Sequence, residues 1–490
     1  MNGVQIFACY TKQPIPEYAG NPLIEALPPI LSDEAAMGLI ANFPYEATPE
    51  ELALERSTRI HCIDRLRSVI QPMLIHLELE SLISLLIRRG YVGRNPTSPA
   101  TVRHLHSLSG AQRYHDGFKS TAETFSLVGL SGIGKSTALW AILSLYPQTI
   151  RHERYEGKQF VHTQITWLKL DCPRDGSLAG FCQEFFIAVG KALGDEDYHQ
   201  RFRARNINDS LQLMAQVAST FFIGARLIDE IQNLHFAKTG GKDSMLNFFL
   251  HLVNNIGIPV VFIGTNSMVS LFSGVLRNAR RCCDAGIIEF KRFEKEDDEW
   301  KMLVENLWSY QWCQQRADLT DDIYDTLYDH TQGVTDFLVK LLVLTQRYVI
   351  QSGSECITAA DIRRVSDSKM QILKPALSAL RSRDPKRMSQ FEDLLPIDEQ
   401  LADMMAFDFV PRPDRLALLR SVKKQRPSIP PSTPDAAKSV TKTNTLAAAV
   451  VTETSMARTI SSSEDPLRAM QNAGWLNQDL FEFSPLYRKG

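Results

Sequence analysis

Paired cysteines, long apolar runs and an excess of either charge are all missing from this 490-residue sequence. The eight cysteines form no C-x-x-C pair, and the closest two, Cys282 and Cys283, are adjacent. This spacing excludes a zinc ribbon or a disulfide scaffold and is typical of a reducing compartment. No run of eighteen apolar residues occurs, and Met1 to Tyr18 lack the basic-then-apolar pattern of a secretion signal. The sequence therefore predicts a cytoplasmic protein without a membrane segment.

The charges of the two signs nearly cancel. The 54 lysines and arginines face 56 aspartates and glutamates, for a net charge of −2. This balance excludes a histone-like polycation, although a local basic face could still bind nucleic acid. A hydrophobic share of 44% over 490 residues is enough for two to four domains with ordinary cores.

Short apolar strands alternate with amphipathic helices through the middle of the sequence. We expect strands at 125–129, 164–170, 226–228, 259–264 and 286–290. We expect helices at 77–89, 135–146, 178–193, 207–222 and 244–256. Gly90 is expected to end the first of these helices. Such alternation predicts an α/β fold, with a parallel sheet flanked by helices on both faces.

The character of the sequence changes twice after residue 293. Helical spacing at 298–312, 321–330, 336–351 and 359–366 predicts a small helical domain, with Thr358 as an N-cap. From Pro411 the sequence is rich in proline, basic residues, serine, threonine and alanine, which predicts a disordered tail. The expected parts are an N-terminal docking segment, the α/β domain with its preceding helix, a helical lid, a connecting helical segment and the tail: 1–75, 76–293, 294–383, 384–410 and 411–490.

One glycine-rich loop follows the first strand of the α/β region and precedes a helix. It matches G-x-x-x-x-G-K-[ST], the pattern of a phosphate-binding loop. Backbone N–H groups of such a loop surround the phosphates, the lysine neutralises the β- and γ-phosphates, and the serine hydroxyl binds Mg²⁺. We therefore expect ATP and Mg²⁺ here, held by Gly129, Leu130, Ser131, Gly132, Ile133, Gly134, Lys135, Ser136 and Thr137.

Two acids end the strand at 226–228. Asp229 is expected to join Ser136 in holding Mg²⁺, and Glu230 to act as the general base that activates water. Thr265 follows the strand at 259–264. It could sense the γ-phosphate together with Asn266, or either residue could simply cap the next helix.

Two further groups of residues are candidates for the same site. Arg280 or Arg281 could reach the γ-phosphate of a neighbouring subunit, although a charged run such as this also fits a solvated face. Tyr91 and Val92 lie just before the nucleotide-binding region and could surround the adenine, or they could belong to a plain connector.

Taken together, these motifs resemble those of AAA+ ATPases. More narrowly, the sequence is similar to TnsC, the AAA+ regulator of TnsABCD-type bacterial transposons, and to its relative TniB, over roughly residues 18–383. The stretches that carry the resemblance are NPLIEALPP, GYVGRNP, SGIGKST, DEIQNL, MLNFF and LRNARR. One departure is visible: the lid stretch Gly333 to Asp336 lacks the usual G-x-x-R arginine, so the lid sensor is either Lys340 or absent.

The resemblance implies an ATPase, slow and regulatory, that assembles into rings or filaments on double-stranded DNA. It also implies a link between a target-selection protein of the TnsD or TniQ type and the transposase. We expect residues 21–29 to contact the target selector, and Trp475 to Tyr487 to contact the transposase or to pack back on their own domain. Sequence-independent DNA contacts are expected from Lys169, Arg174, Arg201, Arg203 and Arg205, in a nucleoid-associated bacterial protein.

Two rival functions also fit the nucleotide motifs, although the basic tail argues mildly against the first of them. One is a signalling switch ATPase of the STAND type, which oligomerises on a protein ligand without DNA. The other is a DNA-translocating or helicase-loading motor, which would hydrolyse ATP quickly.

Overall fold

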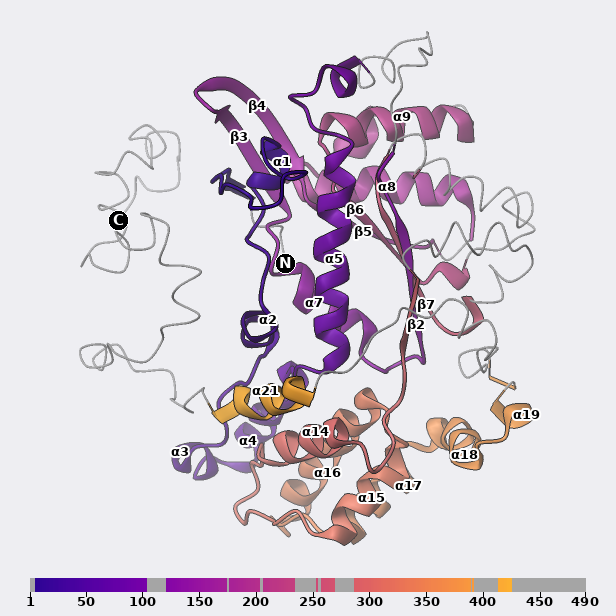
Figure 1. Cartoon of the computed structure of the whole chain (residues 1–490). Coiled ribbons are helices and arrows are strands. Elements are labelled where there is room, and N and C mark those ends of the chain that lie inside the picture. Colours follow the sequence, from indigo (N-terminus) through magenta and orange to yellow (C-terminus); the bar gives the residue numbers. More distant parts are fainter. Residues whose placement is uncertain are drawn as a thin grey trace, which may run out of the picture.

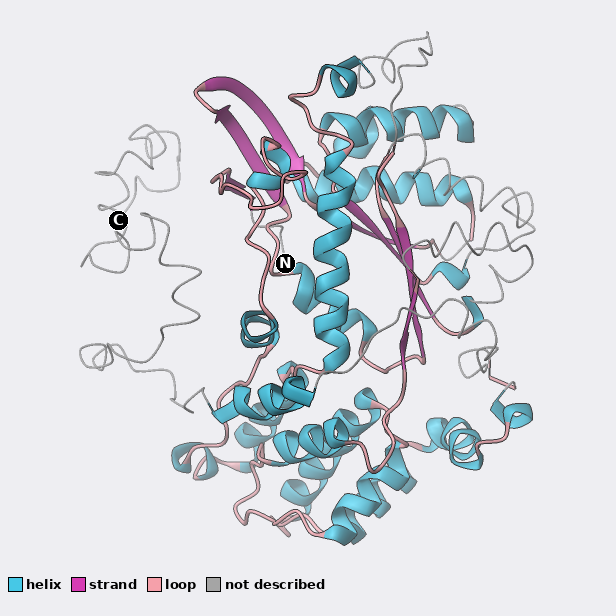
Figure 2. Ribbon diagram, viewed as in Figure 1, coloured by secondary structure: helices cyan, strands magenta, loops and turns pink. Residues whose placement is uncertain are grey.

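The computed structural model describes residues 5–103, 120–173, 176–202, 206–233, 253, 257–268, 286–388, 390–391 and 413–424. An α/β domain lies beside a bundle of helices formed mainly by later parts of the chain (Figure 1), and the strands of its central sheet lie between helices (Figure 2). The strands are β1 (Gln5–Phe7), β2 (Thr124–Gly129), β3 (Thr149–Tyr155), β4 (Lys158–Ile165), β5 (Trp167–Asp171), β6 (Ala225–Asp229), β7 (Val260–Gly264) and β8 (Ile287–Phe290).

The helices before β6 cover the sheet or belong to the N-terminal segment. They are α1 (Pro22–Glu25), α2 (Asp33–Ile40), α3 (Pro49–Leu52), α4 (Arg56–Cys62), η1 (Ile63–Ser68), α5 (Leu74–Val92), α7 (Lys135–Leu143), α8 (Leu178–Leu193), η2 (Tyr198–Arg201) and α9 (Ile207–Thr220). The later helices are η3 (Ile231–Asn233), α14 (Asp298–Trp308), α15 (Asp321–Thr331), α16 (Thr335–Ser352), α17 (Ala359–Lys369), η4 (Gln371–Leu373), α18 (Lys374–Ser382), α19 (Pro385–Met388) and α21 (Pro413–Lys424). The helix expected at 244–256 lies outside the described residues, apart from Val253.

The central sheet has five parallel strands in the order β5-β6-β7-β2-β8. The register pairs Asp171 with Asp229 at the ends of β5 and β6. Because all strands run the same way, their carboxyl ends share one edge, and the glycine-rich loop and the acid pair meet there. The predicted α/β fold with helices on both faces is confirmed.

Alternate residues of each strand pack against different helices. Phe125 and Leu127 of β2 belong to a core shared with α5, α7 and the N-terminal segment, whereas Val128 belongs to a second core shared with α8 and α9. This alternation follows from the two-residue period of a strand buried on both faces. The N-terminal segment therefore packs on the same face of the sheet as α5 and α7.

Helix α5 is longer than expected and continues beyond Gly90. Gly90 is buried inside the helix, where an added Cβ would lie 2.5 Å from Cγ of Pro259. The glycine therefore allows a close approach between α5 and the start of β7, and it does not end the helix. A C-terminal cap and a packing glycine look the same in sequence.

A second, three-stranded sheet in the order β1-β3-β4 was not expected from the sequence. Strands β3 and β4 form an antiparallel hairpin, which projects beside α1 in Figure 1. The predicted strand at 164–170 is in fact the end of β4 followed by β5, separated by Thr166. Many residues of β3 and β4 are polar and exposed, so these strands lack the continuous apolar run that indicates a buried strand.

The segment at 21–29 is expected to contact a target selector through exposed apolar residues, but residues 21–27 are buried. Leu23 and Ile24 have no exposed surface and belong to the first core. Nδ2 of Asn21 donates to the carbonyl oxygen of Tyr91 at 2.8 Å, and Glu25 accepts from Tyr155. The resemblance motif at 21–29 therefore stabilises the fold, and the prediction of an exposed docking site there is wrong.

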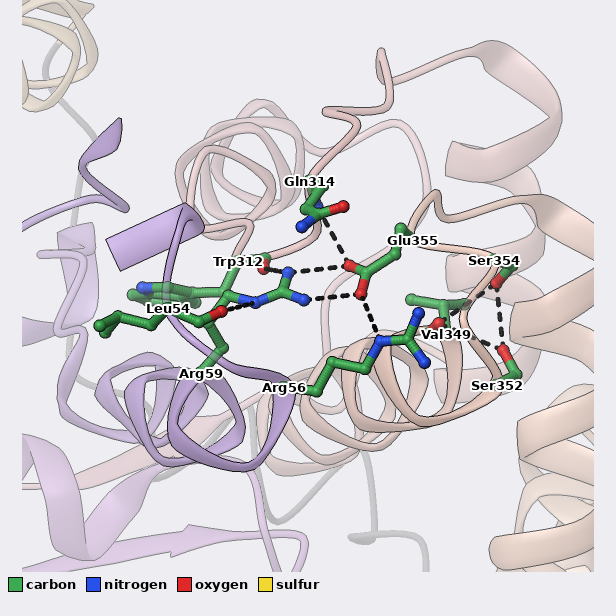
Figure 3. Close-up of polar contacts among 9 residues, drawn as sticks. All are labelled: Leu54, Arg56, Arg59, Trp312, Gln314, Val349, Ser352, Ser354 and Glu355. Atoms are coloured by element: carbon green, nitrogen blue, oxygen red, sulfur yellow. Dashed lines mark hydrogen bonds and ion pairs between the residues drawn. The ribbon is translucent and has the colours of Figure 1, made fainter. Parts of the chain in front are cut away.

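Residues further along the N-terminal segment pack on the helical lid. Ile63 and Leu66 of η1 share a core with Trp300, Trp312 and other lid residues. Arg59 of α4 pairs with Glu355, which follows α16 (Figure 3). In the lid, Thr358 caps α17 as predicted, with its Oγ1 accepting from the N–H of Asp361. The N-terminal segment is thus part of both the α/β core and the lid core.

Helix α21 lies within the stretch that the sequence predicts to be a disordered tail. Arg415 pairs with Asp33 of α2, and Arg420 pairs with Asp298 of α14 in the lid. Leu419 and Val422 are buried in the first core. The beginning of the predicted tail is therefore a docked helix, and its proline-rich, basic composition concealed this. None of the helices in the described ranges is both long and apolar enough to cross a bilayer.

Candidate functional site

The glycine-rich loop joins β2 to α7 at the carboxyl edge of the central sheet. Gly132 and Gly134 have φ of +80° and +106°, a backbone region that strongly favours glycine. Gly129 lies against β8, where an added Cβ would be 2.6 Å from the carbonyl oxygen of Phe290. The glycines of the motif therefore shape the loop and seat it on the sheet.

Lysine, hydroxyl and carboxylate groups converge at this loop. Nζ of Lys135 donates to the carbonyl oxygens of Gly129 and Leu130, at 2.8 and 2.9 Å. Oγ of Ser136 lies 3.5 Å from Oδ2 of Asp229, at the end of β6, which β7 separates from β2 in the sheet. A hydroxyl and a carboxylate side by side are the oxygen ligands that Mg²⁺ prefers. The structure thus brings together Lys135, Ser136 and Asp229, as the sequence predicts.

Glu230 and Thr265 line the same cavity as the loop. Glu230 adopts a left-handed conformation, with φ of +55°, which turns it away from the strand direction of Asp229. Its Oε2 accepts from Nε2 of Gln232 at 2.6 Å, and Oε1 of Gln232 accepts from the N–H of Thr265 at 3.4 Å. Gln232 therefore connects the ends of β6 and β7, a role that its place in the sequence did not suggest.

The contacts of Thr265 are compatible with both expected roles, as a sensor of the γ-phosphate and as a helix cap. Its Oγ1 lies 2.8 Å from Oγ of Ser267, and its carbonyl oxygen accepts from the N–H of Met268 at 2.9 Å, as in a helix cap. Its place on the cavity wall also suits contact with a bound group.

The lid contacts the loop directly through the first turn of α16. The N–H of Asp336 and Oγ1 of Thr335 donate to the carbonyl oxygen of Gly132, at 3.0 and 3.1 Å. An added Cβ on Gly132 would lie 3.2 Å from Cβ of Asp336. Lys340, the candidate lid sensor, pairs with Asp336 one turn earlier on α16. The lid therefore meets the loop through a helix N-terminus, with no arginine in the described residues of this turn.

A cavity of about 600 Å³ extends from the loop toward α5 and α14. Its far end is formed mainly by apolar residues from the segment before α5 and from α14, including Val69, Ile70, Met73, Leu303 and Leu307. This volume is within the usual range for small-molecule sites. The segment at 69–76 was missed in the sequence, because its apolar residues show no strand or helix period.

Tyr91 and Val92, the candidates for adenine contact, lie at the opposite end of the sheet. Tyr91 is completely buried, and its hydroxyl donates to the carbonyl oxygen of Phe222, just before β6. Arg94 packs over the Tyr91 ring and donates to the carbonyl oxygen of Ile223. Val92 packs at the same end of α5. The prediction for Tyr91 and Val92 is wrong, because the carboxyl end of α5, where they lie, is the end remote from the loop.

Lys169, a candidate for DNA contact, lies beside the acid pair. Its Nζ is 3.0 Å from Oδ2 of Asp229 and 2.5 Å from Oδ1 of Asp171, and its side chain is only 13% exposed. Burial lowers the pKa of Lys169, but the two carboxylates outweigh it and raise the pKa overall. The structure therefore contradicts a DNA-facing role, because this ammonium group belongs to the site.

Among the other candidates, Arg201 is exposed, pairs with Asp195 and packs on the ring of Tyr198. The remaining predicted residues lie outside the described residues: Arg174, Arg203, Arg205, Arg280 and Arg281.

The residues that are present fit a magnesium-bound nucleoside triphosphate. The loop offers a cradle shaped by left-handed glycines, Lys135 supplies positive charge, and Ser136 and Asp229 supply hard oxygen ligands. The cavity beyond the loop supplies an apolar surface for a base.

Residues 119–272 match the family model described as an AAA domain, whereas no curated protein sequence matches the chain. A Walker-type ATPase of Pyrococcus abyssi is similar in structure, at 16% identity and a TM-score of 0.34, over 61% of this chain and 84% of that one. The ORC1 protein of Aeropyrum pernix, solved with DNA, is similar at 12% identity and a TM-score of 0.39, over 76% and 86%. DnaA of Aquifex aeolicus, solved with AMPPCP, is similar at 13% identity and a TM-score of 0.28, over 66% and 84%. The chain thus has an α/β fold with a parallel central sheet flanked by helices, and its part at 119–272 matches an AAA domain.

Proposed function

We propose that this protein is an ATP-dependent switch that regulates DNA transposition in the manner of TnsC. The observation that carries the ATP part is a single cavity lined by the loop, by Glu230 and by the first turns of the lid helices α14 and α16. A nucleotide bound there would contact both the α/β domain and the lid. Lid position would then depend on the bound nucleotide, as a switch requires.

Each residue of the site has a distinct part in the proposed reaction. Ser136 and Asp229 would hold Mg²⁺, which neutralises the phosphate charge when bound. Lys135 would donate to the β- and γ-phosphates, and Glu230 would orient the water and accept its proton. Gln232 holds the Glu230 carboxylate at 2.6 Å, so it positions the proposed base. An arginine of a neighbouring copy, Arg280 or Arg281, would complete the site.

The DNA and transposition part of the proposal depends on the resemblance of the sequence to TnsC. Slow hydrolysis suits such a regulator, because the ATP-bound assembly must last long enough to recruit the transposase. Arg201 remains a candidate for DNA contact, and Trp475 to Tyr487 for transposase contact. Deleting residues 475–490 should abolish transposase recruitment and leave ATP and DNA binding intact. Equal loss of all three would contradict the role given to the tail.

Electron microscopy of the full chain with linear duplex DNA tests the central proposal. The conditions are no nucleotide, ATP, ADP and a non-hydrolysable ATP analogue. Rings or filaments on DNA only with ATP or the analogue would support the proposal. Glu230→Gln should make them persist with ATP, whereas Lys135→Ala should prevent them. Assembly without DNA, on a protein ligand, would favour the signalling switch, and rapid ATP turnover with movement along DNA would favour the motor.

A further inference from the structure

The cavity has two ends of different chemistry. Ser131 to Thr137 form the phosphate end, and the other end is enclosed by the segment before α5, the start of α5 and the inner face of α14. Because the loop would hold the phosphates, a nucleotide base would have to lie at this second end. Most of the second end is apolar, so the few polar groups there decide which base is accepted.

Glu299 presents a carboxylate to this second end. It lies in the first turn of α14, one turn before Leu303 and two before Leu307, and all three residues line the cavity. Its Oε1 accepts from the N–H of Leu74 at 2.7 Å and so caps α5. Within the described part of the chain, Oε2 has no hydrogen-bond partner and no basic group pairs with the carboxylate. Burial and the nearby Asp297 raise the pKa of Glu299, whereas the N–H of Leu74 opposes this shift. In its ionised form the carboxylate has only acceptors to offer.

His76 presents a group of the opposite kind. Its Nδ1 accepts from the N–H of Met73 at 2.8 Å, so the neutral ring carries its proton on Nε2. Burial lowers the pKa of His76 to about 4, which keeps the ring neutral at pH 7. The ring packs edge-on against Phe290, and no described residue accepts from Nε2. Nε2–H is therefore a donor on the cavity wall.

Other polar side chains near this end already have partners. The amide of Gln71 donates to the carbonyl oxygen of Pro72 and accepts from Asn306. Arg67 pairs with Asp64. Arg67 and Asp297 also line the cavity but are exposed to solvent. Among the less exposed polar side chains described at this end, Glu299 keeps an unused acceptor and His76 an unused donor.

We propose that Glu299 and His76 select adenine over guanine, with Oε2 of Glu299 accepting from the 6-amino group and Nε2–H of His76 donating to a ring nitrogen. Guanine carries an acceptor oxygen at position 6 and a donor at N1, so it would face Glu299 with the wrong polarity. This inference rests on the proposed function, since it takes the cavity as the ATP site. It adds the two side chains that recognise the base.

Equilibrium binding of non-hydrolysable ATP and GTP analogues to the full chain tests the inference. The wild type should bind the ATP analogue at least about tenfold more tightly, because a mismatched polar pair is left unsatisfied. Glu299→Gln keeps an oxygen for the N–H of Leu74 but replaces the second acceptor with an NH₂ donor. This variant should shift the ATP-to-GTP affinity ratio about tenfold or more toward GTP.

Two further variants separate the possible outcomes. Glu305→Gln, an exposed change on the same helix, should leave the ratio unaltered. His76→Asn keeps an acceptor for the N–H of Met73 but removes the Nε2 donor, so it should weaken ATP binding. This variant also tests the inference if Glu299→Gln does not fold. Failure of the wild type to bind either analogue would overturn the proposed function itself. Binding that Lys135→Ala abolishes, with a ratio that neither Glu299→Gln nor His76→Asn changes, would overturn only the base-selection inference.

Discussion

Arg59 and Glu355 join the N-terminal segment to the lid through two parallel hydrogen bonds. Nη1 and Nη2 of Arg59 donate to Oε2 and Oε1 of Glu355 at 2.8 and 2.6 Å, and only 1% of the arginine side chain is exposed (Figure 3). Nη1 also donates to the carbonyl oxygen of Trp312. The pair links residues almost 300 positions apart and fixes one part of the N-terminal segment on the lid.

Glu355→Gln should destabilise the protein by about 3–5 kcal/mol, because it leaves the Arg59 charge buried without a counterion. The free energy of unfolding in urea measures this effect. Asp322→Asn is the matched control, since it breaks the exposed pair of Asp322 with Arg363. The control should cost less than about 1 kcal/mol. Equal losses in the two variants would contradict a special role for the buried pair.

The same pair predicts a dependence of stability on pH. The hydrogen bond from Arg59 holds the pKa of Glu355 below its ordinary value of 4.5. A lowered pKa in the folded state stabilises the protein above the unfolded value, and this contribution is lost as the pH falls through the folded value. The stability difference between wild type and Glu355→Gln should therefore be constant near neutrality and shrink below about pH 4.5. A difference that grows on acidification would contradict this assignment.

Gly333→Ala should be far more damaging than Gly353→Ala, although both glycines have positive φ, +73° and +82°. An added Cβ on Gly333 would lie 2.0 Å from the backbone oxygen of Phe293, whereas on Gly353 it would meet only the mobile end of Arg56, at 3.0 Å. We expect about 1–2 kcal/mol for Gly353→Ala from the backbone alone and clearly more for Gly333→Ala. Thermal unfolding of both variants checks the order, and similar melting temperatures would contradict it.

Leu419→Ala should release α21 without unfolding the rest of the chain. Leu419 is 2% exposed, less than any other residue of α21 whose burial is described, so losing its packing should cost about 2–5 kcal/mol. Amide hydrogen exchange at 413–424 should rise, while exchange in β2 and β7 stays slow. The exposed change Ala417→Ser is the control. Unchanged protection of α21 in Leu419→Ala would show that this contact does not hold the helix.

Lys169→Met should alter the metal dependence of nucleotide binding and leave DNA affinity unchanged. The ammonium group lies 3.0 Å from Asp229, so its removal changes the charge next to the proposed Mg²⁺ ligands. Titration of Mg²⁺ in a nucleotide-binding assay measures the first effect, and DNA binding over a salt series measures the second. A smaller salt dependence of DNA binding would instead restore Lys169 as a phosphate contact.

The sequence predicts the parts of the fold that depend on local pattern. Strand β2, the loop and β6 follow from apolar runs that end in glycine or acid, and Thr358 follows from its capping pattern. Long-range packing was not predictable in the same way. The motifs at 21–29 and 90–94 turn out to contact each other through Asn21 and Tyr91, and this buries residues that look available in the sequence.

The same distinction between local motifs and long-range packing applies to the residues of the site. Lys135, Ser136, Asp229 and Glu230 are recognisable because one motif or strand end carries each of them. Glu299 and His76 lie in the site because separate elements meet at the cavity, and neither belongs to a motif. Gln232 lies in the DEIQNL stretch, but its contact with Glu230 is visible only in the structure. Only the folded chain brings an acid of α14 next to the start of α5.

The docked helix α21 contacts two parts of the structure: α2 through Arg415 and the lid helix α14 through Arg420. The last 66 residues of the chain begin directly after this helix. If nucleotide binding changes the contact between α21 and α14, it changes the affinity of the tail for whatever binds it. Thermodynamic reciprocity then requires that a partner bound to the tail change nucleotide affinity by the same factor. A protein bound to the tail would thereby change how tightly the chain binds nucleotide.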